Sequence, residues 1–456
     1  MLETLENLTG EFVGIVWGLP LVLALCFSGI FFTIYFGFPQ FRFFKHAIDI
    51  VSGKFDKPED KGEISHFQAL CAALSATVGL GNIAGVAVAI SLGGPGAIFW
   101  LWVAGFIGMA TKFTEVILSL KYRETDELGH VHGGPMFTIK NGLTKKFYPL
   151  AWIYAFFVIL SSFGAGNMFQ SNQMASVLNT SLNIPTWVSG IIFCVFAGLI
   201  LIGGIKRIGK VTEKLVPLMV ALYVLGALGI LGAHFASIPS LFGMIFTDAF
   251  TGTAAIGGFA GVAFKEVVIM GIRRATFSNE AGMGSAAMAH SAAKSTPAQE
   301  GIVALLEPFI DTIVICTITA LALLATGAWS QAGIEGSEMT VWAFEQVYGV
   351  FGRTIVTTTV TLFAFSTVIS WSYYGEQGIT FIFGAKYIPI YRYIFIVFIF
   401  FGAIAQLQLV LNVSDAVYGL LAIPNLIACY ILLPKAKTII NEYVEKWKDG
   451  KIKVYK

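Results

Sequence analysis

The sequence predicts an all-α polytopic membrane protein, and two observations predict it: a low share of charged residues and a series of long apolar runs. Of the 456 residues, 56% are hydrophobic and 12% are charged, whereas a soluble domain carries about twice that charged fraction. Runs of about 20 apolar residues, the length that crosses a hydrocarbon core, recur along most of the chain. The strands of a membrane β-barrel would alternate polar and apolar residues in segments of about ten. The longer, continuous runs therefore indicate helices.

Eleven of these runs are expected to span the membrane. They lie at 12–36, 65–90, 96–121, 149–179, 186–203, 212–235, 252–273, 299–327, 352–383, 390–410 and 415–434. The first eleven residues contain three glutamates and no lysine or arginine. Because a signal peptide would be basic there, the first helix is expected to be retained. The five cysteines stand singly in apolar runs and are expected to be buried hydrophobic residues.

The lysines and arginines predict how the helices are oriented. All 29 except Lys112, Lys265 and Arg353 fall in loops that the eleven spans place on one side, or in the tail after the last span. Positive residues accumulate on the cytoplasmic side, so the amino terminus is expected outside and the tail at 435–456 in the cytoplasm. This tail is expected to be solvated, with a contact to lipid headgroups as the alternative. Beyond the lipid bilayer, we expect no nucleic acid, cofactor or obligatory protein partner.

Glycines interrupt the second span near its middle, in the stretch TVGLGNIAG from Thr77 to Gly85. Glycine weakens a helix, and unwound backbone is tolerated at membrane depth only where it is buried in protein or lines a wet cavity. The amides of Gly79, Leu80 and Gly81 would then lie at the positive end of the following half-helix, which suits a carboxylate. Carbonyls of the preceding half would suit a cation. The alternative is that the glycines allow helices to pack closely.

A similar glycine-rich stretch opens the seventh span. VGLGNIAGVAVA begins at Val78 and AAIGGFAGVAFK begins at Ala254. If the first helix at 12–36 is set aside, each stretch lies in the first of five spans. Transporters built from inverted repeats carry two discontinuous helices at such corresponding positions. We therefore expect a single transport domain over 1–456, with one inverted repeat at 65–235 and a second at 252–434.

Three segments resemble the alanine or glycine:cation symporter family. They are GLGNIAGVAVAISLGGPGAIFWLWVAGFIGMATKFTE at 79–115, GAGNMFQSNQMA at 164–175 and RRATFSNEAGMGSAAMAHSAA at 273–293. The resemblance covers nearly the whole chain and implies the leucine-transporter-like fold. It also implies a sodium- or proton-driven importer of alanine, glycine and similar small neutral amino acids in the cell membrane. Ala275 stands where relatives are expected to have glycine, and its expected place in a cytoplasmic loop puts little in doubt.

The resemblance also implies roles for individual residues. The substrate carboxylate would meet the amides of Gly79, Leu80 and Gly81. The amino group would meet backbone carbonyls of Thr77 and of the Gly257–Gly261 break, which includes Gly258 and Phe259. Sodium would bind the carbonyl of Phe363, the hydroxyls of Ser366 and Thr367, and the carbonyls of Ser75 and Val78. Alternatively, the two hydroxyls bond to carbonyls one turn earlier on their own helix.

Side chains of the fourth span are expected to complete the pocket. NMFQSNQMA places Phe169, Gln170, Gln173 and Met174 within about one turn of each other, and amides at membrane depth usually face the bundle interior. Gln170 is expected to touch the substrate carboxylate or waters beside it. For Gln173 a hydrogen bond between helices is an equal alternative. Asn82 is expected either to cap the broken helix or to bind an ion.

Trp371 is expected to limit the size of the substrate. It follows Thr367 by four residues, so both side chains share one helical face. An indole there, together with Phe169 and Met174, would leave room for a hydrogen or a methyl group. The alternative is a tryptophan at the membrane interface.

Three pairs of charged residues inside the predicted spans need an explanation. They are Lys112 with Glu115, Lys265 with Glu266, and Glu307 with Asp311. Ionisable groups in a membrane are usually paired, so a structural or gating network is favoured over a proton relay. Four histidines, His130, His132, His234 and His290, are expected at the surface.

Other classes of function remain as alternatives. A proton-coupled symporter differs from a sodium symporter only in its ion. An ion channel would need a continuous pore and no two-ended amino acid site. An intramembrane hydrolase would need a nucleophile with a base, or metal ligands such as HExxH, and the sequence contains neither pattern.

Overall fold

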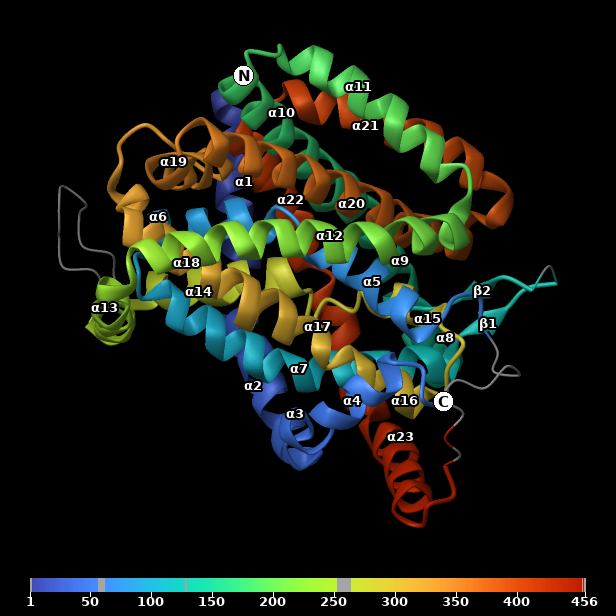
Figure 1. The fold of residues 1–456 in the computed structure, drawn as a ribbon. Helices are drawn as coiled ribbons and strands as arrows, with labels where there is room; N and C mark the ends of the chain where they lie inside the picture. Colours follow the sequence, from blue (N-terminus) through green and yellow to red (C-terminus); the bar gives the residue numbers. More distant parts are fainter. Residues whose placement is uncertain (1, 56–61, 128, 252–263, 453, 455–456) are drawn as a thin grey trace.

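The computed structural model describes residues 2–55, 62–127, 129–251, 264–452 and 454. These residues form a bundle of helices. Its one sheet in the described ranges is the antiparallel pair β1 (Glu124–Thr125) and β2 (Val131–His132). Figure 1 shows α11 and α21 lying side by side at one end of the bundle and α23 projecting from the other end.

The helices up to residue 251 include the expected extra amino-terminal segment and the first broken span. Their bounds are α1 (Leu2–Val16), α2 (Leu19–Tyr35), α3 (Pro39–Arg42), α4 (Phe44–Val51), α5 (His66–Thr77), η1 (Gly81–Gly85), α6 (Val86–Gly93), α7 (Ala97–Tyr122), α8 (Pro135–Gly142), η2 (Lys145–Phe147), α9 (Tyr148–Phe163), η3 (Gly164–Met168), α10 (Phe169–Leu182), α11 (Thr186–Leu201), α12 (Gly204–Ala233), η4 (Phe235–Ser237) and α13 (Ile238–Thr251).

The helices after residue 263 include a second interrupted segment and three long spans. Their bounds are α14 (Phe264–Asn279), α15 (Ala287–Ser291), α16 (Pro297–Ala304), α17 (Leu306–Pro308), η5 (Phe309–Cys316), α18 (Thr317–Thr326), η6 (Ala328–Ser330), α19 (Ser337–Tyr348), α20 (Val350–Phe383), η7 (Ala385–Tyr387), α21 (Ile388–Ile404), α22 (Leu407–Gly419) and α23 (Ala422–Lys448).

Within the described residues, eight helices are long and apolar enough to cross a membrane, and nine if the bent pair of α5 with η1 and α6 counts as one span. The predicted span at 186–203 coincides with a shorter apolar helix, α11. The predicted span at 252–273 begins in residues outside those the structure describes. The count of eleven and the orientation of the termini therefore stay predictions.

The structure differs from the predicted boundaries around the seventh span. Residues 238–251, expected to be a loop, form α13, which packs against α7 and α14. α14 continues to Asn279, six residues beyond the predicted end of the span. Arg273, Arg274 and Ala275 therefore lie inside a helix and not in a cytoplasmic loop. Arg274 and Ala275 are buried.

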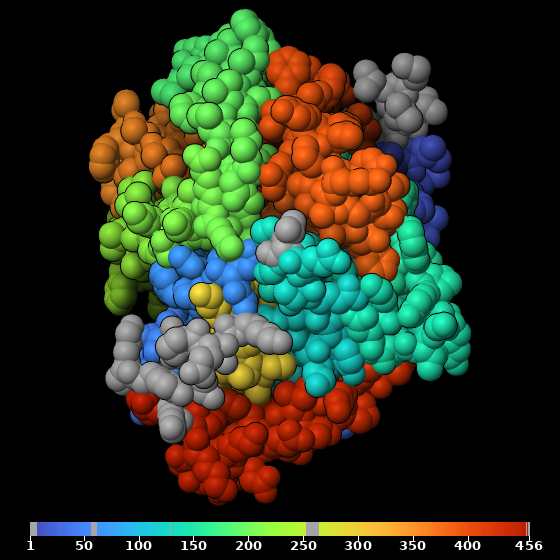
Figure 2. Space-filling model, turned by 90° about the vertical axis from the view of Figure 1, so that its right-hand side faces the viewer, coloured from blue at the N-terminus to red at the C-terminus, as the bar shows by residue number. Residues whose placement is uncertain are grey.

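The expected solvated tail has one buried face, although most of its described residues are exposed. α23 continues through 435–448 as one helix, and Ala436, Ile440 and Val444 on one of its faces are buried. His46 of α4 contacts this segment, because its Nε2 lies 2.8 Å from the hydroxyl of Tyr443. Figure 2 shows the carboxyl-terminal part, in red, spread over one end of the molecule.

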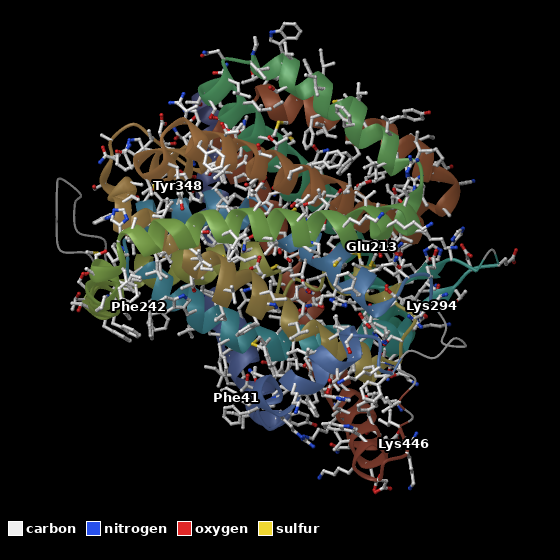
Figure 3. All side chains as sticks on the ribbon, viewed as in Figure 1. Phe41, Glu213, Phe242, Lys294, Tyr348 and Lys446 are labelled. Atoms are coloured by element: carbon white, nitrogen blue, oxygen red, sulfur yellow. The ribbon has the colours of Figure 1, made fainter. Side chains whose placement is uncertain are left out.

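The outer faces of the helices are apolar, and the polar side chains are gathered inside. Phe41, labelled in Figure 3, is 72% exposed, which suits a surface that meets lipid. By contrast, serines, threonines, amides and carboxylates of α5, α7, α14 and α20 are buried. α20 packs against α5, α9, α10 and α12. The site described next lies among these helices.

Candidate functional site

The predicted interruption of the second span is present. α5 ends at Thr77, and Val78 then takes φ −75° and ψ 87°. Helical structure resumes with the π-helical turn η1 at Gly81, and the second half of the span is bent by 49° from the first. Val78 and Leu80 are completely buried. This is unwound backbone enclosed by protein, as the membrane requires.

A second interruption lies beside the first. α14 ends at Asn279 and helix does not resume until α15. Between them Glu280, Gly282 and Gly284 have φ of 59°, 92° and 75°, in the left-handed region that ends a helix. A Cβ built on Gly81 would lie 3.2 Å from the Cα of Ser278, so the two interruptions touch.

This second interruption is later in the chain than the one that the sequence predicted. The expected break at Gly257–Gly261, with Gly258 and Phe259, lies outside the described residues. The stretch SNEAGMG from Ser278 to Gly284 was read as a loop and its residues were missed as part of the site. One feature of the sequence does indicate this interruption: two glycines stand within the seven residues at the end of α14 and directly after it.

α20 and α5 bring three of the predicted cation ligands, Ser75, Ser366 and Thr367, into contact. The hydroxyl of Thr367 donates to the carbonyl of Ser75 at 3.0 Å, and the hydroxyl of Ser75 donates to the carbonyl of Ser366 at 2.7 Å. Ser370, which the sequence analysis did not single out, donates to the Ser75 hydroxyl at 3.0 Å. The Ser366 hydroxyl donates to the carbonyl of Phe363 at 2.9 Å, which is the bond along one helix that the alternative described.

These groups suit a hard monovalent cation. They are neutral oxygens, and the hydroxyls of Ser366 and Thr367 each donate one hydrogen bond and keep lone pairs for a further partner. Val78 follows Ser75 by three residues at the end of α5, where a helix leaves carbonyls without partners. Oxygen donors of this kind are the ligands that hard cations take in proteins.

Amide side chains occupy the backbone donors that follow the first break. The amide of Leu80 donates to Oε1 of Gln170 at 3.3 Å, and the amide of Gly79 donates to Oδ1 of Asn82 at 2.9 Å. Nε2 of Gln170 donates to the carbonyl of Ala165 at 3.0 Å. Asn82 therefore caps the broken helix, one of its two expected roles. The side-chain oxygens of Asn82 and Gln170 therefore occupy the amides of Gly79 and Leu80, to which the prediction assigns the substrate carboxylate.

Gln173 has another partner. Its Oε1 accepts from the amide of Ser337 at 3.0 Å, at the start of α19, so it joins two helices. The hydroxyl of Thr77 donates to the carbonyl of Ala73 at 3.1 Å within its own helix, whereas the role predicted for Thr77 belongs to its backbone carbonyl and stays a prediction.

Aromatic rings enclose this region. Trp371, 3% exposed, packs against Tyr418 with ring centroids 5.8 Å apart. Tyr418 packs against Phe277, and Phe277 packs edge to face against Phe169, each at 5.4 Å. Met174 is also buried. The sequence analysis missed Phe277 and Tyr418, whose positions in space no local pattern gives.

The profile of the sodium:alanine symporter family matches residues 2–456. The chain belongs to this family. The sodium/alanine symporter AgcS of Methanococcus maripaludis is 41% identical over 94% of each chain. The probable sodium/glutamine symporter GlnT of Bacillus subtilis is 34% identical over 100% of this chain and 94% of its own length. The family is one of transporters, so this is a multi-pass transport protein of the cell membrane and not an enzyme.

Solved structures support the fold. The structure of MhsT in complex with L-phenylalanine superposes with a TM-score of 0.50 at 15% identity and covers 82% of this chain and 99% of that one. A manganese transporter of Eremococcus coleocola gives 0.51 at 13% identity, covering 85% and 82%. Both are transporters of the leucine-transporter fold. At these identities the likeness concerns the fold alone.

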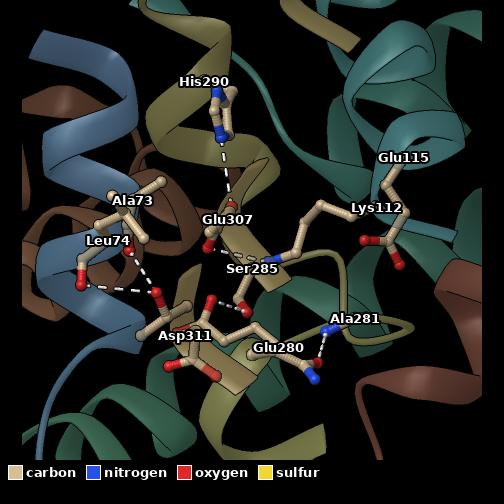
Figure 4. A network of polar contacts seen from close by, with 12 residues as sticks. Ala73, Leu74, Lys112, Glu115, Glu280, Ala281, Ser285, His290, Glu307 and Asp311 are labelled. Carbon is tan, nitrogen blue, oxygen red and sulfur yellow. Dashed lines mark hydrogen bonds and ion pairs between the residues drawn. The ribbon is translucent and has the colours of Figure 1, made fainter. Parts of the chain in front are cut away.

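The buried charges of this symporter pair differently from the prediction. Lys112 donates to Glu307 at 3.0 Å, whereas Glu115 accepts from the amide of Gly282 at 2.9 Å and from Asn425 at 2.6 Å. Lys265 is exposed and Glu266 only partly buried, so the expectation of a pair inside a span is wrong there. Figure 4 shows Lys112, Glu307 and His290 linked in one network.

Asp311 and the arginines of α14 extend the polar interior. Asp311 accepts from Asn82 at 2.7 Å and from the hydroxyl of Ser278 at 3.0 Å, so it contacts both interruptions. Arg273 and Arg274 both pair with Asp415 of α22. No local pattern predicts this pairing, because the partners are more than a hundred residues apart.

Two of the four histidines are not at the surface. His290 is completely buried and His132 is 9% exposed. His130 is exposed, as expected. The error for His290 arises because its partners come from later helices, so its own neighbours in sequence do not show its burial.

Proposed function

We propose that the protein imports small neutral amino acids, alanine and glycine, in symport with sodium through alternating access. The observation that carries this proposal is the contact between Thr367 and Ser75, which joins α20 to the last turn of α5. Directly beyond that turn lie the amides of Gly79 and Leu80. One broken helix therefore offers oxygen ligands on one side and backbone donors on the other.

This arrangement would couple the two cargoes. Sodium held by Ser75, Val78, Phe363, Ser366 and Thr367 would fix the end of α5 against α20. The substrate carboxylate would replace the side-chain oxygens of Gln170 and Asn82 on the amides of Leu80 and Gly79. Because both partners require the same backbone conformation, each would favour binding of the other. This coupling lets a sodium gradient drive accumulation of the amino acid.

The proposed substrate class rests on the enclosure and on the relatives. Trp371 and Phe169 are buried in the aromatic cluster with Phe277 and Tyr418. This cluster favours a small side chain. The relative AgcS is named a sodium/alanine symporter, whereas GlnT is named a probable sodium/glutamine symporter. Glutamine is therefore tested as a competitor of alanine uptake.

Uptake into liposomes tests the proposal. The purified protein would be reconstituted, and radiolabelled alanine uptake measured under an inward sodium gradient, under an inward proton gradient, and under neither. We expect saturable uptake that requires the sodium gradient and is inhibited by glycine more than by leucine or glutamine. Uptake driven by the proton gradient alone would assign proton symport instead. Flux without saturation would indicate a channel.

A further inference from the structure

A buried chain of alternating acids and bases lies where α5 begins, away from the ligands proposed for sodium and the amino acid. It consists of His66, Glu300, His290, Glu307 and Lys112, in that order. Neighbours in the chain are 2.6, 2.8, 3.3 and 3.0 Å apart. None of the five side chains is more than 1% exposed.

The geometry of His290 requires a bound proton. Its Nδ1 lies 2.8 Å from Oε1 of Glu300, and its Nε2 lies 3.3 Å from Oε2 of Glu307. A neutral imidazole has one nitrogen that accepts and does not donate, and that nitrogen would face a carboxylate oxygen. Either an imidazolium donates from both nitrogens, or one carboxyl group is protonated and donates to the ring. In both cases His290, Glu300 and Glu307 together hold one proton in this conformation.

The bound proton also offsets buried negative charge. Together with Lys112 it opposes the carboxylates of Glu300 and Glu307, while His66 contacts Glu300 at 2.6 Å. Without this proton, a ring nitrogen lone pair would face a carboxylate oxygen. An unbalanced charge is costly at this burial.

Most other charged or titratable groups on the elements around α15 have partners of their own, whereas the hydroxyls of Tyr373 and Tyr374 have no hydrogen-bond partner among the described residues. Glu115 is held by Gly282 and Asn425, and Arg123 donates to the carbonyls of Ser291 and Ala293. The remaining ones are His132, paired with Asp126, and, on α20, Tyr373, Tyr374 and Glu376, the last paired with Arg392. Glu280 lies in the same interior and accepts from Ser285.

Backbone hydrogen bonds beside this chain of acids and bases close one end of the bundle. Glu63 donates its amide to the carbonyl of Ala292 at 2.7 Å, and Lys294 donates its amide to the carbonyl of Ile64 at 2.7 Å. His66 follows this closure as the first residue of α5, and His290 precedes it on α15. The chain of acids and bases therefore links α5 to α15. These are the segments of the two interrupted helices that meet at this end.

We propose that His290, with Glu300 and Glu307, forms a proton-binding site that is occupied while this end is closed and loses its proton when the end opens. When α5 and α15 separate, water reaches the imidazole and its two carboxylates no longer face it. An exposed histidine loses its proton near pH 6.5. Closure is then linked to the uptake of one proton, and acidification favours the closed end. The site is separate from the proposed sodium and amino acid sites.

Hydrogen exchange of the closure amides tests this directly. Protection of the amides of Glu63, Ile64 and Lys294 reports how often this end opens. Exchange would be measured by mass spectrometry from pH 5.5 to 8.5, without sodium or amino acid, and corrected for the intrinsic rate at each pH. For one linked proton, protection should fall by up to about tenfold per pH unit above about pH 6.5. In His290→Gln it should no longer depend on pH.

Two variants serve as controls. His234→Gln makes the same change where the ring contacts the carbonyl of its own helix, and the pH dependence should remain. If His290→Gln does not fold, Glu300→Gln decides, because the removal of one carboxylate weakens proton binding in the closed state, so the fall that begins near pH 6.5 should level off at a lower pH. Protection independent of pH in the unmodified protein, an unchanged slope in His290→Gln or an unshifted curve in Glu300→Gln would overturn the proposal. Because the assay uses no cargo, its failure is distinct from failure of the proposed symport.

Discussion

Gln170 and Gln173 have the same side chain but different partners. Gln170 lies on the amide of Leu80 at the first break, whereas Gln173 holds Ser337 at the start of α19. Once the carboxylate has displaced it from Leu80, the Gln170 side chain is predicted to donate its amide N–H to the same carboxylate. Gln170→Ala should therefore weaken alanine binding about tenfold at saturating sodium, the scale of one hydrogen bond of about 1.4 kcal/mol. Equilibrium binding of labelled alanine to the purified protein measures it.

Gln173→Ala is the matched control for that prediction. It removes an equal amide that does not touch the break, so alanine affinity should stay within about twofold of the unmodified protein. Equal losses in the two variants would show that Gln170 acts through packing and not through the substrate.

Trp371 should set the upper limit of substrate size. Replacement by Leu removes the ring that packs against Tyr418 and Tyr374, so leucine and valine should be admitted while alanine and glycine bind more weakly. A rigid wall discriminates more sharply than a missing methylene, which is worth about 1–3 kcal/mol. Competition by each amino acid against alanine uptake measures the change.

The exposed Trp187 of α11 offers the control, because it is 54% exposed. Trp187→Leu should leave the order of preference unchanged. A folded and active Trp371→Leu variant with the original preference among glycine, alanine and leucine would exclude the indole as the wall of the pocket.

At the scale of elements, the second interruption depends on backbone that only glycine adopts readily. Gly284 has φ 75°, and a Cβ there would meet Pro135 and Asn425, the residue that holds Glu115. Gly384 has φ 90° with no neighbour within 4 Å of a Cβ among the described residues. Both Gly→Ala changes cost about 1–2 kcal/mol of backbone strain.

Only Gly284→Ala also displaces side chains at the interruption. It should lower alanine uptake more than about tenfold per folded molecule, whereas Gly384→Ala should retain most of the uptake. Uptake normalised to the amount of folded protein, with melting temperatures for both variants, separates the two effects. Similar uptake in the two variants would contradict a role for the Ser278–Gly284 stretch in transport.

At the scale of the whole molecule, the sequence predicts the helices well where apolar length decides and poorly where distant charges decide. The span that becomes α20 is predicted at 352–383 and observed at Val350–Phe383. α14 is predicted to end too early because Arg273 and Arg274 look like loop residues. Their partner Asp415 lies on α22, and no local pattern reveals it.

The residues of the site divide in the same way: those in local motifs are predicted, and those that depend on distant partners are not. The contact of Thr367 with Ser75 is predicted because both lie in recognisable motifs, and the structure brings them together. The role of SNEAGMG was missed because polar residues after two arginines look solvated. His290 was missed for a related reason: its burial depends on carboxylates of α16 and α17, which only the folded chain brings to it.

The sodium dependence of alanine binding in Thr367→Ala tests the central claim most directly. In the unmodified protein, alanine affinity should rise with sodium concentration and then saturate. Because the variant lacks one oxygen ligand at the junction of α5 and α20, it should reach the same affinity only at sodium concentrations about tenfold higher or more, with a melting temperature close to that of the unmodified protein. Alanine binding that ignores sodium in the unmodified protein, or an identical sodium curve in Thr367→Ala, would contradict the account.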